Sequence, residues 1–348
     1  MANIMVYKTE YLQPHHYRIF AGVYNDFYKK AFSEYKFELE PLTCEEFCQA
    51  VEDGLLQCII LTEDEIPTAF LAATTLISDA IELNIIHCLG EENIIAKKKV
   101  LLEKFLDENA ALIKEKTTTY PLLGKQDDFV CDITHYGFKL VGLAVTRFKF
   151  DDISRVAVLK NTPKPEIMEG YSIKNWDNMY REKAVEIINE SFKDASDALF
   201  DPRFLTKEGC EDIVGKILDG VYGEFLPQAT KVLLYNNEPV GLCFVNITGG
   251  LIGNIPLVGI QKDHLKTESG GQQEQEAKRS IKKGLGNALV YNALDTVFDM
   301  VQNKELELSE INASVETDNF AAVKMYRYCG FKEDYHYPQA YLPAGGRR

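Results

Sequence analysis

The same order of predicted helices and strands occurs twice along this chain of 348 residues, and this repeat limits the possible folds more than any single motif. In each half a strand and two helices are followed by three strands, then a helix and a further strand. Two copies of one order indicate two copies of one fold, not two unrelated domains. Helices and strands mixed in this way predict an α/β architecture, in which each copy has a mixed, mostly antiparallel central sheet flanked by helices.

The first copy is predicted at residues 1–155. Apolar side chains at positions i, i+3, i+4 and i+7 predict its first helix, and Asp64 with Glu65 predicts a hairpin turn. The other predicted elements are strands at 4–12, 57–62, 69–78, 81–88, 120–123 and 140–150 and helices at 44–52 and 94–116. Three strands in a row indicate an antiparallel meander.

The second copy is predicted at residues 171–342, with a linker at 156–170 and a tail at 343–348. Two prolines and a glycine within 161–170 are typical of a linker. The predicted strands are at 171–176, 231–235, 239–248, 252–261 and 311–315, with a hairpin turn at Asn236 and Asn237. One predicted helix carries Val185, Ile188 and Phe192 on one face, a second is at 206–219, and a third follows residues 282–289 and ends near residue 301. Residues 262–280 are polar and glycine-rich, and are predicted as a loop that is either merely solvated or a lid over a substrate.

Composition excludes several classes of partner. The formal net charge of −15 disfavours nucleic acid and anionic membranes, because both require basic patches. The N-terminus lacks the pattern of a secretion signal, and the longest apolar run, at 67–78, is too short to span a bilayer. The eight cysteines form no C-x-x-C pair and no zinc spacing, so we expect no metal site and a cytoplasmic protein with reduced thiols.

One segment near the end of the chain, residues 314–331, predicts a strand, a capped helix, a glycine stop and another strand. Asp318 or Asn319 can cap the helix by accepting a hydrogen bond from an orphan backbone N–H group. Gly330 ends the helix, because a left-handed residue at this position costs glycine nothing. Phe331 then opens the last strand.

A second motif precedes this segment. Gly284, Leu285 and Gly286 lie before a predicted amphipathic helix, and Lys282 and Lys283 add positive charge. Glycines let backbone N–H groups approach a phosphate closely, and a helix N-terminus favours an anion. A turn in which the glycines only relieve strain remains an alternative. The spacing fits neither a dinucleotide-binding fingerprint nor a Walker loop.

Together the two motifs resemble the GNAT superfamily of acyl-coenzyme A-dependent N-acyltransferases over residues 170–340. The C-terminal pattern is matched by Asn319, Ala322, Tyr326 and then Gly330 with Phe331. The glycine loop resembles the family's Q/R-x-x-G-x-G/A pattern, except that Ile281 stands where the glutamine or arginine should be. That departure puts one side-chain contact with the coenzyme in question, but not the backbone cradle.

The resemblance implies a mechanism. Tyr326 matches the general acid, which protonates the leaving thiolate; a phenol has an ordinary pKa of about 10 and a thiol about 8.5. The backbone N–H groups of a splayed strand would face the thioester carbonyl, and here that strand contains Val258, Gly259 and Ile260. The remaining implied coenzyme contacts are Lys282, Lys283, Gly284, Leu285, Gly286, Asn287 and Asn319. The general base is not identified; Asp263, His264 and Glu268 are predicted near the site, and His336 and Tyr337 are candidates for the lining of the acceptor cleft.

The first copy departs from the same pattern. Counting back from Gly137 and Phe138 places Ile133 at the tyrosine position and Gln126 at the asparagine position. The counterpart of its glycine loop, residues 88–92, carries two acidic residues, which would repel a pyrophosphate at a helix N-terminus. We therefore expect a degenerate first copy that binds no acyl-coenzyme A.

The predicted function is transfer of acetyl from acetyl-CoA to a primary amine by direct attack, in the second copy. The acceptor is left open: a small molecule, a peptide or a protein. One alternative is a non-catalytic CoA-binding sensor or interaction module. The other is a related transferase that uses a longer acyl donor.

Overall fold

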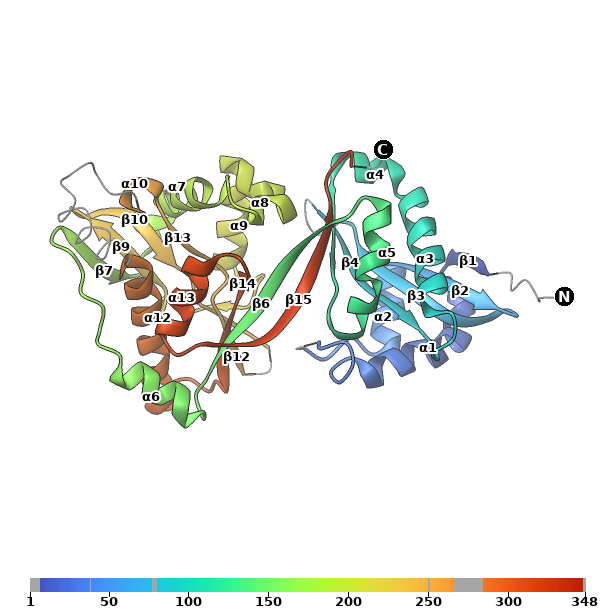
Figure 1. The fold of residues 1–348 in the computed structure, drawn as a ribbon, viewed down its shortest axis with the longest axis horizontal. Helices are drawn as coiled ribbons and strands as arrows, with labels where there is room; N and C mark the ends of the chain where they lie inside the picture. Colours follow the sequence, from blue (N-terminus) through green and yellow to red (C-terminus); the bar gives the residue numbers. More distant parts are fainter. Residues whose placement is uncertain (1–6, 38, 77–79, 250, 266–283, 347–348) are drawn as a thin grey trace. The chain divides into compact units, whose positions relative to one another are not determined.

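The computed structural model describes residues 7–37, 39–76, 80–249, 251–265 and 284–346, and the chain forms two compact units (Figure 1). The first unit comprises residues 1–142, 199–201 and 337–348, and the second comprises residues 143–198 and 202–336. Each unit contains both helices and strands and has hydrophobic cores of its own.

The first unit is built on a sheet with the strand order β1-β2-β3-β4-β5-β15. The strands are β1 (Lys8–Tyr11), β2 (Gln57–Glu63), β3 (Ile66–Thr74), β4 (Ala80–Cys88), β5 (Thr117–Pro121) and β15 (Lys332–Leu342). The helices are α1 (Tyr17–Lys30), α2 (Cys44–Glu52), α3 (Ile94–Glu108), α4 (Ala110–Glu115) and α5 (Val130–Ile133), with short 3-10 turns η1 (Pro14–His16), η2 (Gly124–Phe129) and η3 (Thr134–Tyr136). β4 and β5 run parallel. The other neighbouring strands in this order run antiparallel.

Side chains alternate between the two faces of the sheet along each strand, so each face carries apolar side chains. Helices cover both faces and bury these side chains. In β2, Ile59 and Leu61 enter a core with α3, whereas Cys58 and Ile60 enter a second core with α1 and α2. Figure 1 shows α3 and α5 in front of the strands of this unit. The predicted meander and its turn are confirmed, since Asp64 and Glu65 adopt positive φ angles between β2 and β3.

The second unit has two groups of strands, in the orders β6-β14-β12-β11-β8 and β13-β10-β9-β7. Its strands are β6 (Lys139–Lys149), β7 (Tyr171–Asn175), β8 (Glu224–Phe225), β9 (Lys231–Tyr235), β10 (Glu238–Cys243), β11 (Asn246–Thr248), β12 (Ile252–Asn254), β13 (Val258–Ile260) and β14 (Glu310–Glu316). Its helices are α6 (Ile153–Asn161), α7 (Arg181–Phe192), α8 (Asp197–Phe200), α9 (Lys207–Leu218), α10 (Lys262–Leu265), α12 (Gly284–Gln302) and α13 (Phe320–Tyr328), with 3-10 turns η4 (Asn178–Tyr180) and η5 (Pro202–Leu205).

Two cores flank the second sheet in the same manner as in the first unit. Val232 and Leu242 pack with α7 and α9, whereas Leu233 and Cys243, on the opposite faces of the same strands, pack with α12 and α13. The predicted turn between β9 and β10 is confirmed by the positive φ angles of Asn236 and Asn237. None of the described helices is long and apolar enough to cross a membrane.

Two strands exchange partners between the copies that the sequence predicts. The last strand of the first copy, β6, pairs through residues 143–149 with β14 of the second unit. The last strand of the second copy, β15, pairs through residues 339–342 with β5 of the first unit. Each copy therefore completes its sheet with a strand that the other copy supplies.

This exchange explains why the compact units differ from the predicted boundaries. Residues 143–155 were expected in the first domain and residues 337–342 in the second, but the units place them the other way. The predicted linker at 156–170 is also too long, because α6 extends to Asn161. Asp152 caps α6 by accepting hydrogen bonds from the backbone N–H groups of Ser154 and Arg155, and Leu159 anchors it in the core.

The helix predicted at 94–116 is interrupted. Asn109 ends α3 and its side-chain amide donates a hydrogen bond of 2.9 Å to the carbonyl of Phe105, after which α4 begins. An asparagine competes for backbone partners in this way, which is why it is a weak residue in helix interiors. The predicted strands at 239–248 and 252–261 are each divided in two, and the second division shapes the site described below.

We predict that Leu342→Ala will destabilise the first unit although Leu342 lies at the end of the second copy. Its side chain is fully buried in the core of β2 to β5, so the truncation should lower the free energy of unfolding by about 2–5 kcal/mol. Hydrogen exchange should show lost amide protection in β5. The control is Ile66→Ala, since Ile66 is 60% exposed in the same unit. Equal loss in both variants would contradict the exchange of strands.

Candidate functional site

The candidate site begins where one strand of the second unit changes its hydrogen-bond partner. β12 runs parallel to β14, and the last bond of this pair joins the Ile255 N–H to the Asn312 carbonyl at 2.9 Å. Two residues later, the Leu257 carbonyl accepts from Phe244 beside β10, and β13 continues along β10. Pro256 lies between these bonds and has no N–H group, so it cannot continue either ladder. β13 and β14 therefore diverge and leave a wedge between them.

Backbone donors of β13 face this wedge. Residues 257 and 261 bond to β10, through the Leu257 carbonyl and through the Gln261 N–H, which is 2.9 Å from the Val240 carbonyl. Because backbone groups alternate in direction along a strand, the N–H groups of Val258 and Ile260 point away from β10. No hydrogen bond occupies these two groups within the described residues. Ser191 of α7 donates a bond of 3.1 Å to the Ile260 carbonyl and holds the strand in place.

The segment after β14 folds as predicted. Asn319 is the N-cap of α13, and its side-chain oxygen accepts a hydrogen bond from the Ala322 N–H at 3.1 Å. Gly330 follows the helix with a φ angle of 92°, and a Cβ atom there would lie 2.9 Å from the Arg155 carbonyl oxygen. Only glycine satisfies both demands, so the helix must end at this residue. Asn319 itself is exposed and occupied with the cap.

Tyr326 lies on the buried side of α13. It is 5% exposed, and its ring centroid is 5.3 Å from that of Phe331. Its hydroxyl makes no hydrogen bond with a described residue, whereas the hydroxyl of Tyr328, two residues on, donates to the Pro163 carbonyl at 2.8 Å. Burial, with smaller contributions from Cys243, Cys329 and Asp197, raises the pKa of Tyr326 far above the ordinary phenol value assumed from the sequence. Tyr326 is thus a protonated donor with no partner.

The glycine motif forms helix instead of the predicted loop. Gly284, Leu285, Gly286 and Asn287 lie at the described start of α12. A Cβ atom at Gly286 would lie 2.9 Å from the Met325 sulfur, so this glycine permits close packing of α12 on α13. A Cβ atom at Gly284 would meet no heavy atom of the described structure within 4 Å. Lys282 and Lys283 lie outside the described residues.

The described site residues that the sequence singles out therefore belong to one unit, on β13, on α12, and on α13 and its N-cap. Pro256 is a determinant that the sequence reading missed, although a proline inside a predicted strand signals a bulge or an end of pairing. Of the residues predicted near the site, His264 has a ring nitrogen 2.8 Å from the Tyr171 hydroxyl, and Glu268 lies outside the described residues. His336, a candidate for the acceptor cleft, is exposed. The described part of the chain contains no cluster of three metal-ligating side chains.

The first unit has the same divergence of strands, but its wedge is filled. β4 pairs with β5 only at residues 80–82, and the rest of β4 follows β3. The Ile86 N–H, which faces the wedge, donates to the side-chain oxygen of Gln126 at 3.4 Å. The buried Tyr120 hydroxyl donates to the same oxygen. Gln126, at the position of Asn319, thus occupies the space with its own amide.

Charged side chains close the same region of the first unit. Lys98, 2% exposed, pairs with Asp128 and donates to the Lys125 carbonyl at 3.4 Å. His87, on β4, is also buried. Its Nδ1 lies 2.6 Å from the Tyr35 hydroxyl and its Nε2 lies 3.1 Å from an Asp26 carboxylate oxygen. Burial outweighs the attraction of Asp26 and lowers the pKa of His87 to about 4, so the ring is neutral at neutral pH.

Comparison with known proteins places the fold. No family model and no curated protein matches the sequence. A GCN5-related N-acetyltransferase from Sphaerobacter thermophilus superposes with a TM-score of 0.61 at 14% identity, over 97% of this chain and 96% of that one. A tandem GNAT protein from the clavulanic acid biosynthesis pathway has a TM-score of 0.54 at 8% identity, over 97% and 99% of the chains. A GCN5-related glucosamine N-acetyltransferase region of a fungal β-N-acetylglucosaminidase has a TM-score of 0.59 at 9% identity, over 98% and 38%.

We predict that acid destabilises the first unit through His87. Between pH 6.5 and about 4 the unfolded chain binds a proton that the folded chain excludes, so the free energy of unfolding falls as the pH falls. The full effect is on the order of 3 kcal/mol. Urea unfolding at a series of pH values should show a flatter dependence for His87→Asn and an unchanged one for His135→Asn, which alters an exposed histidine of the same unit.

NMR of the wild-type chain provides a second measurement that requires no variant. The His87 ring signals should not titrate above pH 5, whereas an exposed histidine titrates near 6.5. A His87 titration midpoint near 6.5 would contradict the prediction, because it would show that burial does not oppose protonation of the ring.

Proposed function

On the premise that the chain has the GNAT fold in two tandem copies, we propose that it is an acyl-CoA-dependent N-acyltransferase with its active site in the second unit. The transferred group is acetyl and the acceptor is a primary amine. The observation that carries the proposal is the contrast between the two wedges: in the first unit Gln126 occupies the β4 donor, and in the second unit the β13 donors have no described partner.

The residues of the second unit suit a thioester. A carbonyl placed in the wedge could accept hydrogen bonds from the N–H groups of Val258 and Ile260, which point there without a partner. Such preorganised donors stabilise the oxyanion that forms when an amine attacks a carbonyl. No heavy atom of the described residues lies within 4 Å of the place a Cβ atom would take at Gly284, which suits an approaching pyrophosphate. Lys282 and Lys283 precede Gly284 in the sequence. These residues and Asn319 remain our proposed contacts for acetyl-CoA.

Tyr326 is proposed as the general acid. Its raised pKa keeps the hydroxyl protonated at every pH at which the enzyme would work. The raised pKa also makes complete proton transfer to a thiolate harder than the sequence reading assumed. Low polarity strengthens the hydrogen bond from the hydroxyl to a developing thiolate, because the surroundings screen the charge less. Tyr326 would therefore stabilise the leaving group first and release its proton as the carbon–sulfur bond breaks.

The two alternatives differ from this proposal in one component each. A CoA-binding sensor would use the same wedge and α12 without chemistry at Tyr326. A transferase with a longer acyl donor would keep Tyr326 but need more apolar space in the wedge. All eight cysteines are free thiols, which suits the reducing cytoplasm that we propose for the protein.

We predict that Tyr326→Phe will reduce kcat for acetyl transfer by about 10²-fold, because the hydroxyl acts only when the thiolate leaves. The KM for acetyl-CoA should stay unchanged. Tyr328→Phe is the matched control, since it removes a hydroxyl from the same helix that is already bonded to a carbonyl. Release of free thiol measures the reaction. Full activity in Tyr326→Phe with intact coenzyme binding would favour the sensor alternative or another acid.

We also predict that the whole chain binds a single acetyl-CoA. In the first unit the side-chain oxygen of Gln126 already accepts hydrogen bonds from the Ile86 N–H and the Tyr120 hydroxyl in the wedge. A thioester would have to displace this buried network without replacing all of its hydrogen bonds. Isothermal titration of the intact protein should give a stoichiometry of one. Two equivalent sites would show that the first copy is not degenerate.

A further inference from the structure

A groove in the first unit lies away from the wedge that Gln126 fills. Its volume is about 510 Å³, which is within the range of about 300–1,000 Å³ that small-molecule sites occupy. Its lining comes from the end of β1, the start of β2, the residue after β3 and the C-terminal end of α2. β4 begins at this end of the sheet, whereas Ile86 of the wedge lies near the other end of β4. The groove is therefore separate from the degenerate coenzyme site.

Two tyrosines of the groove are held in place through their hydroxyl groups. The Gln57 amide donates a hydrogen bond of 3.0 Å to the Tyr11 hydroxyl. The side-chain oxygen of Gln57 in turn accepts a bond of 3.0 Å from Asn109, which is buried. On the other side, the Tyr17 hydroxyl donates to the Cys48 carbonyl of α2 at 3.3 Å. Both rings are thus ordered before a ligand arrives, which lowers the entropic cost of binding.

Glu52 gives the groove a negative charge that has no balancing cation in the described lining. It is the last residue of α2, and no described ion pair includes it. None of the described lining residues is a lysine, arginine or histidine. The last turn of α2 also lacks a basic residue, so the negative end of the helix dipole adds to the charge of Glu52. Lys116 reaches the same end of the sheet, where it donates to the Thr75 carbonyl at 3.2 Å, but it does not line the groove.

The carboxylate lies beside one of the two rings. Burial, followed by the adjacent Glu52 carboxylate, raises the pKa of Tyr17 to about 12, so this phenol stays neutral and the charge of Glu52 remains uncompensated. Aromatic rings attract cations, and most strongly where water is excluded. Aliphatic side chains complete the walls: Leu12, Pro14, Val51 and Leu56. A ligand that fits this lining has a positive charge and an apolar surface.

The hydrogen bonds already made in the groove favour a quaternary ammonium over a primary one. A primary ammonium brings three N–H groups, and each needs an acceptor. Tyr17 already uses the Cys48 carbonyl, and Asn109 already uses the side-chain oxygen of Gln57. A quaternary ammonium has no N–H group to satisfy, and its methyl groups suit aromatic and aliphatic walls.

We propose that this groove binds a small quaternary ammonium ion, with the positive charge beside Glu52 and the methyl groups against Tyr11 and Tyr17. The site goes beyond acetyl transfer and does not depend on it, because all of the described lining residues belong to the first unit. The first copy then has a ligand of its own although its coenzyme wedge is filled. The net charge of the chain, −15, also attracts a cation at long range.

The test titrates choline into the intact protein and measures the heat of binding. The comparison ligand is 3,3-dimethylbutan-1-ol, which has the shape of choline but a carbon atom in place of the charged nitrogen. Wild-type protein should bind choline at one site and the neutral alcohol at least about tenfold more weakly, because the alcohol lacks the charge that Glu52 and the rings attract. The titration contains no acetyl-CoA, so its result is independent of the proposed reaction.

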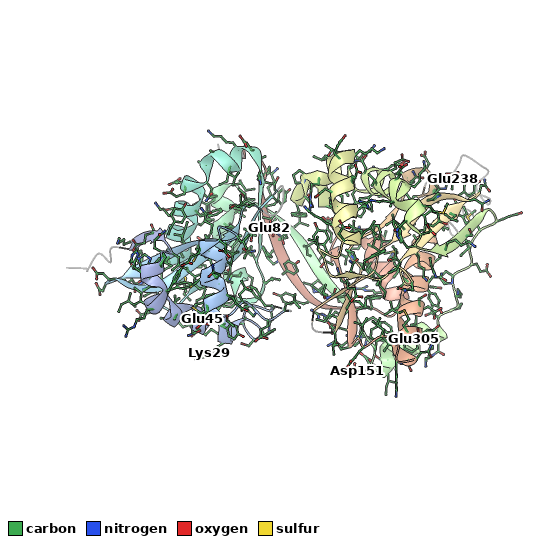
Figure 2. All side chains as sticks on the ribbon, turned by 180° about the vertical axis from the view of Figure 1, so that it is seen from behind. Lys29, Glu45, Glu82, Asp151, Glu238 and Glu305 are labelled. Carbon is green, nitrogen blue, oxygen red and sulfur yellow. The ribbon has the colours of Figure 1, made fainter. Side chains whose placement is uncertain are left out.

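Three variants locate the bound cation. Glu52→Gln keeps the size of an exposed side chain but removes its charge, and should weaken choline binding about tenfold. Tyr17→Leu removes the ring beside the carboxylate and should weaken binding about fivefold. The matched control is Glu45→Gln, which removes one negative charge from the exposed first turn of the same helix, outside the groove (Figure 2). This control should keep the wild-type affinity.

Weaker choline binding in Glu52→Gln together with wild-type binding in Glu45→Gln supports the site. Four results overturn it. Wild-type affinity in Glu52→Gln or in Tyr17→Leu would place the cation elsewhere. Equal weakening in both glutamate variants would reduce the effect to net charge. Equal binding of choline and the neutral alcohol would show that the groove does not select a cation, and no binding of choline to the wild type would reject the site outright.

Discussion

The structure of the second unit depends on one change of hydrogen-bond partner. Ile255 bonds to β14 and Leu257 bonds to β10, and Pro256 between them bonds to neither. A continuous ladder across these residues would pair the N–H groups of Val258 and Ile260 with β14 and close the sheet. Within the described residues, the break leaves those groups without a hydrogen-bond partner, in the same unit as the buried Tyr326, whose hydroxyl also has none there. A sheet with an interrupted hydrogen-bond ladder is less stable than a continuous one. The same interruption leaves backbone N–H groups available to a substrate, so the site is obtained at the expense of stability.

The two copies show how one backbone arrangement can be kept open or closed. Both units have diverging strands at the same point of the fold, but different side chains follow. Asn319 remains exposed and caps α13, whereas Gln126 turns inward and satisfies the Ile86 N–H. Two differences accompany these outcomes. The Gln126 side chain is one methylene longer than that of Asn319, and Gln126 lies in the 3-10 turn η2 and not at the start of a regular α-helix. The buried Lys98–Asp128 pair then completes a polar interior that needs no ligand.

Much of this architecture could be predicted from the sequence, because local signals determine it. The Asn319 cap, the Gly330 stop and the turns at Asn236 and Asn237 follow from the conformations that these residues favour. The exchange of β6 and β15 could not be predicted, since either pairing satisfies the same alternation of apolar side chains. The position of Gly286 within a helix was also missed, because its reason is contact with Met325, far along the chain.

The exchange of strands has a consequence for how the protein is made. Residues 339–342 pair with residues 118–121, so the sheet of the first unit lacks a strand until the ribosome has translated more than 200 residues beyond β5. During that interval β5 presents an unpaired edge, which other chains can use as a template for aggregation. The nascent first copy thus needs protection for the time taken to synthesise more than 200 further residues, about 10–40 s at 5–20 residues per second. Because one chain carries both copies, separate chains need not find each other before either sheet can close.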